Sequence, residues 1–305
     1  MRVIKPAAIT DTSLTASNVA ESDAPAWTSG GSYSTGQRVI DNHHIYEWLG
    51  SAAGNTATRP SQDASVPARW LDTGADNRWR MFDKKAGNKY LLGQATTNPE
   101  AIDVTIRPGE VVNSIGLFGV QGSSIQIIME DPDEGVVYDK TITMADTGAN
   151  NWYDYWFSPF DRKETMVQFD LPAYGTADIR IVVNYPGSTA AVGLLVLGAS
   201  TEIGTAVWGT AFGYQSYSKT EEDDFGNITI TPRGSRRYVD FDVRIDTPQI
   251  DRVARFLDRL KGTPAVYIGA ASMESTIVMG VYDSLNPVIS NPAFCEMTLE
   301  VRSLQ

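Results

Sequence analysis

Apolar residues recur at every second position over short segments of this chain, and this feature limits its fold the most. From Val239 to Ile245, apolar side chains alternate with charged ones. From Ile102 to Ile106 they alternate with polar ones, and the segment stops at a Pro-Gly pair. A period of two places successive side chains on opposite faces of a half-buried β-strand. The pattern therefore predicts a mainly β fold.

Strand-like segments fill the middle and the end of the chain, with turn residues between them. Those within residues 77–204 are short and evenly spaced, which favours an antiparallel β-sandwich or jelly roll. Residues 205–305 contain further strands, the last of them alternating up to Val301. The other predicted strands are Ser124 to Met129, Val136 to Ile142, Met166 to Leu171, Asp178 to Tyr185, Val192 to Leu197, Ala265 to Ile268, Thr276 to Tyr282 and Phe294 to Val301.

One segment near the C-terminus follows a helical period instead. Thr247 can cap a helix, Pro248 suits the first helical position, and Gly262 is typical of a helix end. Between them, apolar residues fall on one face and charged residues lie largely elsewhere. We expect this face to be buried, either in the core or in an interface between subunits. The residues proposed for that interface are Ile250, Val253, Leu257 and Leu260.

The length of 305 residues predicts two or three folded units. Residues 1–24 are polar, with no strand period beyond Val3-Ile4, and are predicted to be an extended arm or a disordered tail. Residues 25–76 form a short aromatic module with two strands around an Asp-Asn turn. Residues 77–204 are the predicted sandwich. Residues 205–305 are predicted to be a β domain with one helix.

Two clusters of aromatic residues are candidates for binding. A module of about fifty residues buries little surface, so large rings must supply part of its core. Rings beyond that need are costly to expose unless they meet a partner, and exposed flat rings can hold sugars. The candidates in the module are Trp27, Tyr33, Tyr46, Trp48 and Trp70. In the second cluster, residues 152–160, we expect several rings to point inward.

The formal net charge of −12 bears on the partners of the chain. Phosphate backbones repel an acidic protein, which argues against nucleic acid as the main partner. No stretch approaches the ~20 apolar residues of a membrane helix, and residues 1–10 lack the apolar region of a secretory signal. The only cysteine, Cys295, lies in an alternating strand, where a buried inert thiol is expected. We therefore expect folding in a reducing cytoplasm and no membrane insertion.

Residues that could carry catalysis are sparse, and neither a G-x-S-x-G elbow nor a phosphate-binding loop occurs. His43 and His44 are adjacent and would point to opposite faces of a strand, which disfavours a shared metal. Acidic runs at Glu130-Asp131 and at residues 221–224 are more typical of solvated loops than of an acid–base pair. The loop of residues 131–135 lacks the full spacing of a calcium loop, and a charged turn is favoured there over Ca²⁺. We expect a protein that is not an enzyme, with no cofactor and no metal site.

The aromatic module carries a motif. Its parts are Ala26-Trp27, Gly31-Ser32-Tyr33, Gly36-Gln37-Arg38-Val39 and Ile45-Tyr46-Glu47-Trp48, with a closing Trp in Pro67-Ala68-Arg69-Trp70. In this order the motif resembles the small chitin/cellulose-binding modules that are often attached to chitinases. The resemblance implies that rings of the module stack on sugar, first of all Trp27, Tyr46 and Trp48. Modules of this type recur in tail and fibre proteins of bacteriophages.

The chain as a whole resembles tail-tip (baseplate) proteins of long-tailed bacteriophages. The opening Val3-Ile4-Lys5-Pro6, with Ile9-Thr10-Asp11, is followed at once by the sugar-binding-like module. The C-terminal segment is similar to the distal-tail type of domain. Its parts are Gly226-Asn227, a strand from Arg236 to Ile245, the helix from Ile250 to Leu260, and Gly262-Thr263-Pro264-Ala265-Val266. The middle segment is similar, by pattern, to a galactose-binding-type jelly roll.

This resemblance implies a virion structural protein that is made in the host cytoplasm and forms part of a ring at the distal end of the tail. Its partners would be the tail tube, the hub and neighbouring copies of itself, and the module would contact host surface polysaccharide. Two other functions stay open from the residues. One is a stand-alone carbohydrate-binding protein, which the missing signal region opposes. The other is a polysaccharide-degrading enzyme, which the lack of a placed carboxylate pair opposes.

Overall fold

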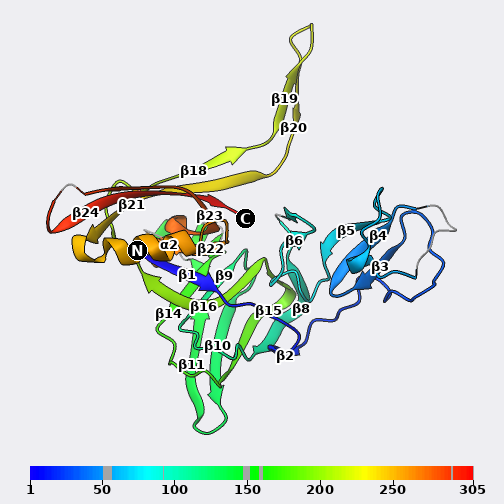
Figure 1. The fold of residues 1–305 in the computed structure, drawn as a ribbon, viewed down its shortest axis with the longest axis horizontal. Coiled ribbons are helices and arrows are strands. Elements are labelled where there is room, and N and C mark those ends of the chain that lie inside the picture. Colours follow the sequence, from blue (N-terminus) through cyan, green and yellow to red (C-terminus); the bar gives the residue numbers. More distant parts are fainter. Residues whose placement is uncertain (51–56, 92, 147–151, 158–160, 290, 305) are drawn as a thin grey trace.

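The computed structural model describes residues 1–305 except 51–56, 92, 147–151, 158–160, 290 and 305. The fold is mainly β, which confirms the class predicted from the alternation. Three parts extend in different directions (Figure 1): a body built on two sheets, a small module, and a long hairpin that leaves the body. None of the helices in the described residues is long and apolar enough to cross a membrane.

A sheet of ten strands runs through the body. Its order is β14, β9, β16, β1, β22, β23, β24, β21 and β17, and β18 also pairs with β21. Each strand is antiparallel to its neighbours. The strands are β1 (Arg2–Pro6), β9 (Ser114–Phe118), β14 (Met166–Phe169), β16 (Leu194–Glu202), β17 (Thr205–Ala206), β18 (Ala211–Ser216), β21 (Ser235–Asp246), β22 (Ala265–Ile268), β23 (Ile277–Val288) and β24 (Phe294–Ser303).

Strand β1 lies in the middle of this sheet, between β16 and β22. Ile4 pairs with Ser200 on one side and with Val266 on the other. Val3 and Ile4 are fully buried and belong to the cores on opposite faces of the sheet, as in any strand that is covered on both faces. The prediction of an extended arm or a disordered tail therefore fails at the first strand. The predicted boundary at residue 204 does not separate two sheets either. Strand β1 pairs with β16, which precedes this boundary, and with β22, which follows it, in one sheet.

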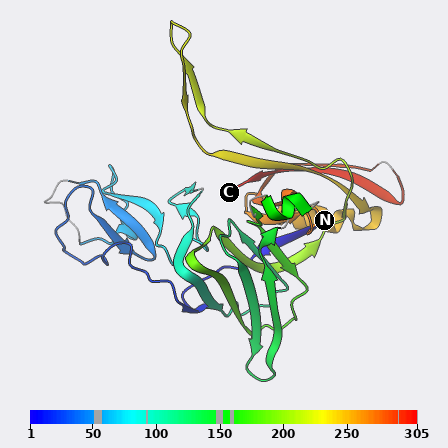
Figure 2. The ribbon, with the colours of Figure 1, turned by 180° about the vertical axis from the view of Figure 1, so that it is seen from behind.

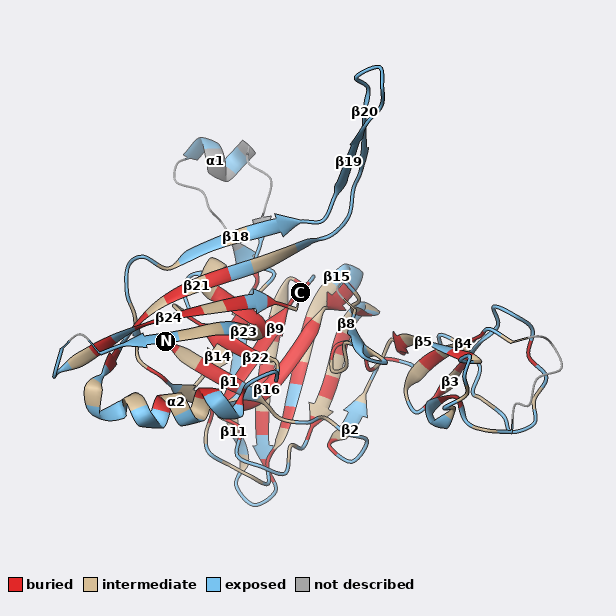
Figure 3. Ribbon diagram, turned by 45° about the horizontal axis from the view of Figure 1, so that its top comes forward, coloured by how far each residue is buried: buried red, intermediate tan, exposed pale blue. Residues whose placement is uncertain are grey.

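The second sheet has five strands in the order β11, β10, β15, β8 and β2. It packs against the β9, β14 and β16 part of the large sheet, and both sheets point alternate apolar residues into one core, such as Ile125 and Ile127 from one and Ile115 and Leu117 from the other. Figure 3 shows this buried layer between the sheets. It forms the predicted sandwich, with an edge strand from the N-terminal segment. The strands are β2 (Leu14–Ser17), β8 (Thr96–Ile106), β10 (Ser124–Asp131), β11 (Gly135–Thr143) and β15 (Asp178–Val192).

Helix α2 (Ile250–Arg259) covers the C-terminal part of the large sheet. A 3-10 turn, η2 (Thr247–Gln249), holds Pro248 and precedes the helix, so the helix begins later than predicted. Thr247 is not its cap, because the Thr247 hydroxyl donates a hydrogen bond to the carbonyl of Asn291 at 3.1 Å. Gly262 has a φ of 71° and ends the segment as predicted. A further 3-10 turn, η3 (Glu274–Thr276), leads into β23.

The small module contains a three-stranded antiparallel sheet, and it lies across the body from α2 when seen from either side (Figures 1 and 2). Its first two strands and the turn between them are those predicted. A short hairpin then connects the module to the sandwich. The elements are β3 (Arg38–Asp41), β4 (His44–Trp48), the 3-10 turn η1 (Pro60–Gln62), β5 (Trp70–Ala75), and the hairpin strands β6 (Lys85–Ala86) and β7 (Lys89–Tyr90).

Two segments project from the body. The first, which we call the arm, spans residues 211–238: β18 and the start of β21 are continued by the pair β19 (Lys219–Glu222) and β20 (Ile228–Thr231). Figure 1 shows the arm extending beyond every other part of the chain. The second is a short helix, α1 (Trp152–Phe157), between β12 (Ala145–Asp146) and β13 (Asp161–Arg162), and it stands away from the sheets in Figure 3.

Candidate functional site

Most of the predicted sugar-stacking rings form the core of the small module. Tyr33, Trp48 and Trp70 are buried together around Val39. The Trp70 ring centroid lies 5.3 Å from that of Tyr33 and 4.7 Å from that of Trp48, in edge-to-face arrangements. A module this small has few aliphatic residues, so aromatic rings form most of its hydrophobic core. The proposal that Tyr33, Trp48 and Trp70 stack on sugar is therefore not supported.

Trp27 and Tyr46 are the two candidate rings that keep some surface. Both are partly buried and pack against the module core. The guanidinium of Arg59 lies 5.7 Å from the centroid of the Trp27 ring, and Arg59 also pairs with Asp41 at 3.3 Å. Burial raises the pKa of the Tyr46 hydroxyl to about 12, so the hydroxyl stays neutral. A sugar site in this module would have to use these two rings.

His43 joins the module to the N-terminal segment. It lies in the turn between β3 and β4 with a φ of 66°. Its Nε2 lies 2.8 Å from a carboxylate oxygen of Asp11, and its Nδ1 lies 2.8 Å from one of Glu21. Burial opposes a charged ring, but the hydrogen bonds to Glu21 and Asp11 outweigh it and raise the pKa of His43. The ring is also stacked on Trp79, with centroids 4.3 Å apart.

His44 is held between two carboxylates in the same way. Its Nδ1 lies 3.0 Å from Asp72 of β5, and its Nε2 lies 3.3 Å from Asp83, just outside the module. The hydrogen bonds to Asp72 and Asp83 raise the pKa of His44 to about 9, although burial opposes the charge. The two histidines therefore pair with separate carboxylates, although His43 lies in the turn before β4 and not on a strand as predicted. Among the described residues, no cluster of three or more ligands could hold a metal ion.

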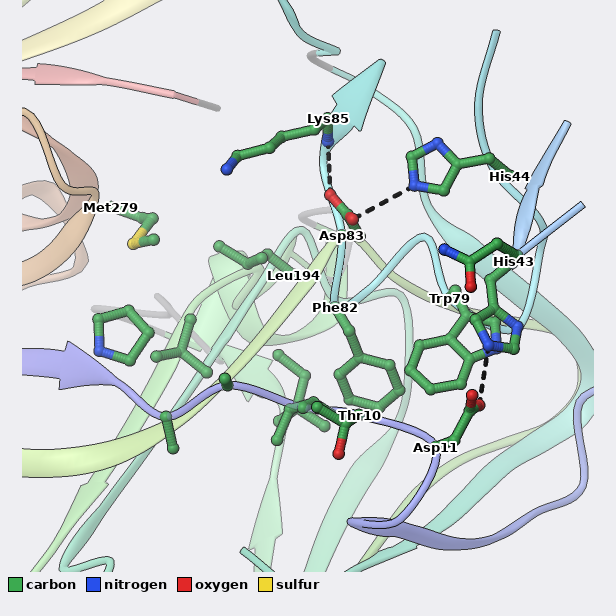
Figure 4. Close-up of a pocket in the computed structure, with 17 residues that line it drawn as sticks. Thr10, Asp11, His43, His44, Trp79, Phe82, Asp83, Lys85, Leu194 and Met279 are labelled. Atoms are coloured by element: carbon green, nitrogen blue, oxygen red, sulfur yellow. Dashed lines mark hydrogen bonds and ion pairs between the residues drawn. The ribbon is translucent and has the colours of Figure 1, made fainter. Parts of the chain in front are cut away.

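A cavity of about 470 Å³ lies beside these histidines, between the module and the body. Figure 4 shows His43 above Asp11 and Trp79, and His44 near Asp83, on one side of the cavity. Leu194 and Met279 line the other side. The described hydrogen-bond partners of both histidine rings are carboxylates, so the arrangement holds charge. The cluster thus fastens the module to the body. Its carboxylates were missed from the sequence, although a His-His pair in an acidic chain is a signal for them.

The apolar face of α2 is buried inside the chain. Val253, Leu257 and Leu260 have 2% or less of their surface exposed and pack with the C-terminal strands, while Ile250 is partly buried against the same cluster. These residues are therefore core and not the assembly interface that was one of their two predicted roles. An amphipathic helix beside a sheet buries its apolar stripe on that sheet first.

The acidic loops and the cysteine have structural explanations. The Asp131 carboxylate accepts hydrogen bonds from the Thr176 hydroxyl at 2.6 Å and from the Asp133 N–H at 3.1 Å, and the first of these lowers the Asp131 pKa most. Asp131 thus organises the turn between β10 and β11, as the charged-turn interpretation predicts. Cys295 is buried, with its Sγ 3.5 Å from the carbonyl oxygen of Ile245.

The arm exposes large apolar side chains along its length. Phe225, in the turn at its end, has 91% of its surface exposed, and Ile228 and Ile230 follow at 63% and 65%. The turn is well defined, because the Asp223 carboxylate accepts hydrogen bonds from the N–H groups of Phe225 and Asn227 at 2.9 and 2.8 Å. In this part of the chain, only the acidic run and Gly226-Asn227 were singled out from the sequence. The apolar residues directly after that run were the available signal.

Helix α1 also presents rings to solvent. Trp152, Tyr153 and Trp156 are 76, 70 and 69% exposed. We expected several rings of the second cluster to point inward, and these three do not, because the helix stands on a two-stranded stalk away from both sheets. The other rings of the cluster, the side chains of Tyr155 and Phe157 and the whole of Phe160, lie outside what the structure describes.

Comparison of this chain with protein-family models, with curated proteins and with solved structures gave no match. The candidate functional surfaces are the arm, the exposed rings of α1, the two partly exposed rings of the module, and the histidine junction.

Proposed function

We propose that this chain is a structural component of the tail tip (baseplate) of a long-tailed bacteriophage, and that it acts by assembly and not by catalysis. The observation that carries the proposal is the arm. It projects from the body and exposes Phe225, Ile228 and Ile230 to solvent. A soluble protein rarely exposes large apolar side chains in one place unless a partner covers them.

The low stability of an isolated hairpin supports this proposal. An isolated two-stranded hairpin is marginally stable in water, because it buries little apolar surface. The pair β19 and β20 is such a hairpin, and all of its residues are exposed. Covering its apolar side chains removes them from water and stabilises the contact. We therefore expect another subunit to cover the apolar side chains of the arm.

The place of the protein in a tail follows from the resemblance. The chain would form part of a ring at the distal end of the tail, contact the tail tube, the hub and its own copies, and reside in the virion. The module, on the side of the body opposite α2, would be free to face the host surface.

The test uses the full chain and a shortened one. Ser216 pairs with Ser235 in the arm, so replacing residues 217–234 by Asn-Gly closes β18 and β21 with a two-residue hairpin turn. We expect the wild type to sediment as a defined oligomer, and the shortened chain to be a folded monomer with an unchanged circular dichroism spectrum. A wild type that stays monomeric at all concentrations, or a shortened chain that still assembles, would contradict the proposal.

The second function, carbohydrate binding, is supported by the partly exposed rings of Trp27 and Tyr46. It is compatible with assembly, and as a stand-alone function it requires a monomer. Titration with chitin oligomers and with envelope glycans, followed by NMR of the ring signals, tests it. Shifts that Trp27→Ala abolishes support a sugar site, and no shift with any glycan makes the module a spacer.

A further inference from the structure

A second cavity, of about 680 Å³, lies at the root of the arm. Its wall includes Tyr214 of β18 and Arg237 of β21, and it continues to the loop before β8 and to the β12–β13 stalk. Phe118 and Leu194, both buried, and Leu304 give it apolar parts. The volume is in the range of cavities that hold small ligands or an anchoring side chain.

Cationic groups converge on this cavity, in a chain with a net charge of −12. They are Lys84, Arg162 and Arg237. Burial lowers the pKa of Lys84 to about 8, which leaves it charged at neutral pH. The Nη2 of Arg237 donates to the carbonyl of Glu274 at 2.9 Å, but no described group accepts a hydrogen bond from its buried Nε.

Two carboxylates also line the cavity. One oxygen of Glu274 accepts a hydrogen bond from the Glu164 N–H at 3.0 Å, so Glu274 is partly engaged within the wall. Glu164 is the other. Three cations against two carboxylates leave the lining positive, so the cavity favours an anionic group, and its apolar parts favour a ring or an aliphatic side chain.

The end of the arm has the complementary composition. Four acidic residues, 221–224, directly precede Phe225. The Asp223 carboxylate accepts hydrogen bonds within the turn, and Glu221 pairs with Lys219. Glu222 and Asp224 are exposed, and they lie near Phe225, which is 91% exposed. Aromatic side chains are enriched at protein interfaces and often act as their anchors. Figure 1 shows this end far from the root of its own arm.

We propose that the end of the arm of one copy binds in the arm-root cavity of a second copy, with the Phe225 ring as the anchor and the carboxylates of Glu222 and Asp224 beside the three cations. The proposal rests on the proposed function and names the surface that receives the arm. The two contact surfaces differ, so each copy offers one end and one cavity. The contact therefore repeats from copy to copy and closes a ring if the rotation allows.

The test uses two full-length variants and their mixture. Phe225→Ala changes a side chain that is 91% exposed, and Arg162→Glu changes an exposed side chain of the cavity wall, so both chains should fold. We expect each change to weaken self-association at least about tenfold, as for an interface anchor. Trp208→Ala, at a 95% exposed ring outside the arm, is the matched control and should assemble like the wild type.

Mixing the two variants is the decisive measurement. The Arg162→Glu chain keeps an intact arm and the Phe225→Ala chain keeps an intact cavity, so an equimolar mixture should form dimers that neither variant forms alone. Normal assembly of both single variants, with loss of assembly in the shortened chain, would overturn this inference and leave the proposed function standing. A mixture that stays monomeric would also overturn it.

Discussion

Replacing His44 by Gln removes an imidazolium that lies between Asp72 and Asp83 and leaves an amide of similar reach. The His44 side chain has 15% of its surface exposed, and its two nitrogens lie 3.0 and 3.3 Å from the two carboxylates. Asp72 belongs to the module and Asp83 lies beyond it. The change should therefore weaken the connection between the module and the body, and the loss should depend on pH.

The magnitude follows from the pKa. The rise of the His44 pKa from 6.5 to about 9 corresponds to about 3 kcal/mol in favour of the folded, charged form. Because the pKa is higher in the folded than in the unfolded chain, this stability is fully present below pH 6.5 and is lost as the pH rises through about 9. About 2 kcal/mol of it should disappear between pH 7 and pH 9.

The assay is urea unfolding followed by tryptophan fluorescence, at pH 7 and at pH 9, for the wild type and for His44→Gln. We expect the variant to be less stable by about 2–3 kcal/mol at pH 7 and by less than about 1 kcal/mol at pH 9. Lys84 also titrates near pH 8, but it does so in both proteins and cancels in the difference. A difference that is equal at the two pH values would refute the reasoning.

Three further substitutions, each with a control, test the fold, and one activity assay tests the proposal that the protein is not an enzyme. Leu257→Asp places an unpaired charge at a fully buried position and should cost about 4 kcal/mol or more, whereas Asp258→Asn on the exposed side should fold normally, as judged by solubility and thermal melts. Trp48→Ala should destabilise the module by about 3–5 kcal/mol and collapse its NMR dispersion, while Trp27→Ala keeps the dispersion. Gly198→Ala would put a Cβ 2.0 Å from the Lys5 carbonyl oxygen and should displace β1, with a loss of about 2 kcal/mol or more in urea unfolding; Gly234→Ala has open space and should be neutral. No reducing ends should be released from chitin or peptidoglycan, and activity that Glu130→Gln abolishes would overturn the non-enzyme assignment.

The sequence predicts well those elements whose pattern is local. The alternation in β21 and β8 and the end of α2 shortly before Gly262 each depend on a few consecutive residues, and the structure has them close to where they were expected. The predicted sandwich is found as well, although its pairs β8–β15 and β2–β8 join strands that are far apart in the chain.

The sequence does not predict how a ring or a strand is placed relative to residues that are far away in the chain. Trp27 and Trp48 look alike in sequence, and only the packing around Val39 decides that Trp48 is core. Strand β1 has two apolar residues, Val3 and Ile4, and its partner strands β16 and β22 are far along the chain. The carboxylates that hold the two histidines come from four separate places, so no spacing in the sequence predicts them.

The central place of β1 has a consequence for the order of folding. Ile4 is synthesised long before its partners Ser200 and Val266. Pairing over such a sequence separation is slow, because the loop must close before any contact forms. Until then β16 and β22 keep unpaired edges, which attract other chains. The sheet around β1 should therefore form only after Val266 has been synthesised, and the yield of folded protein should depend on protein concentration and on chaperones during synthesis.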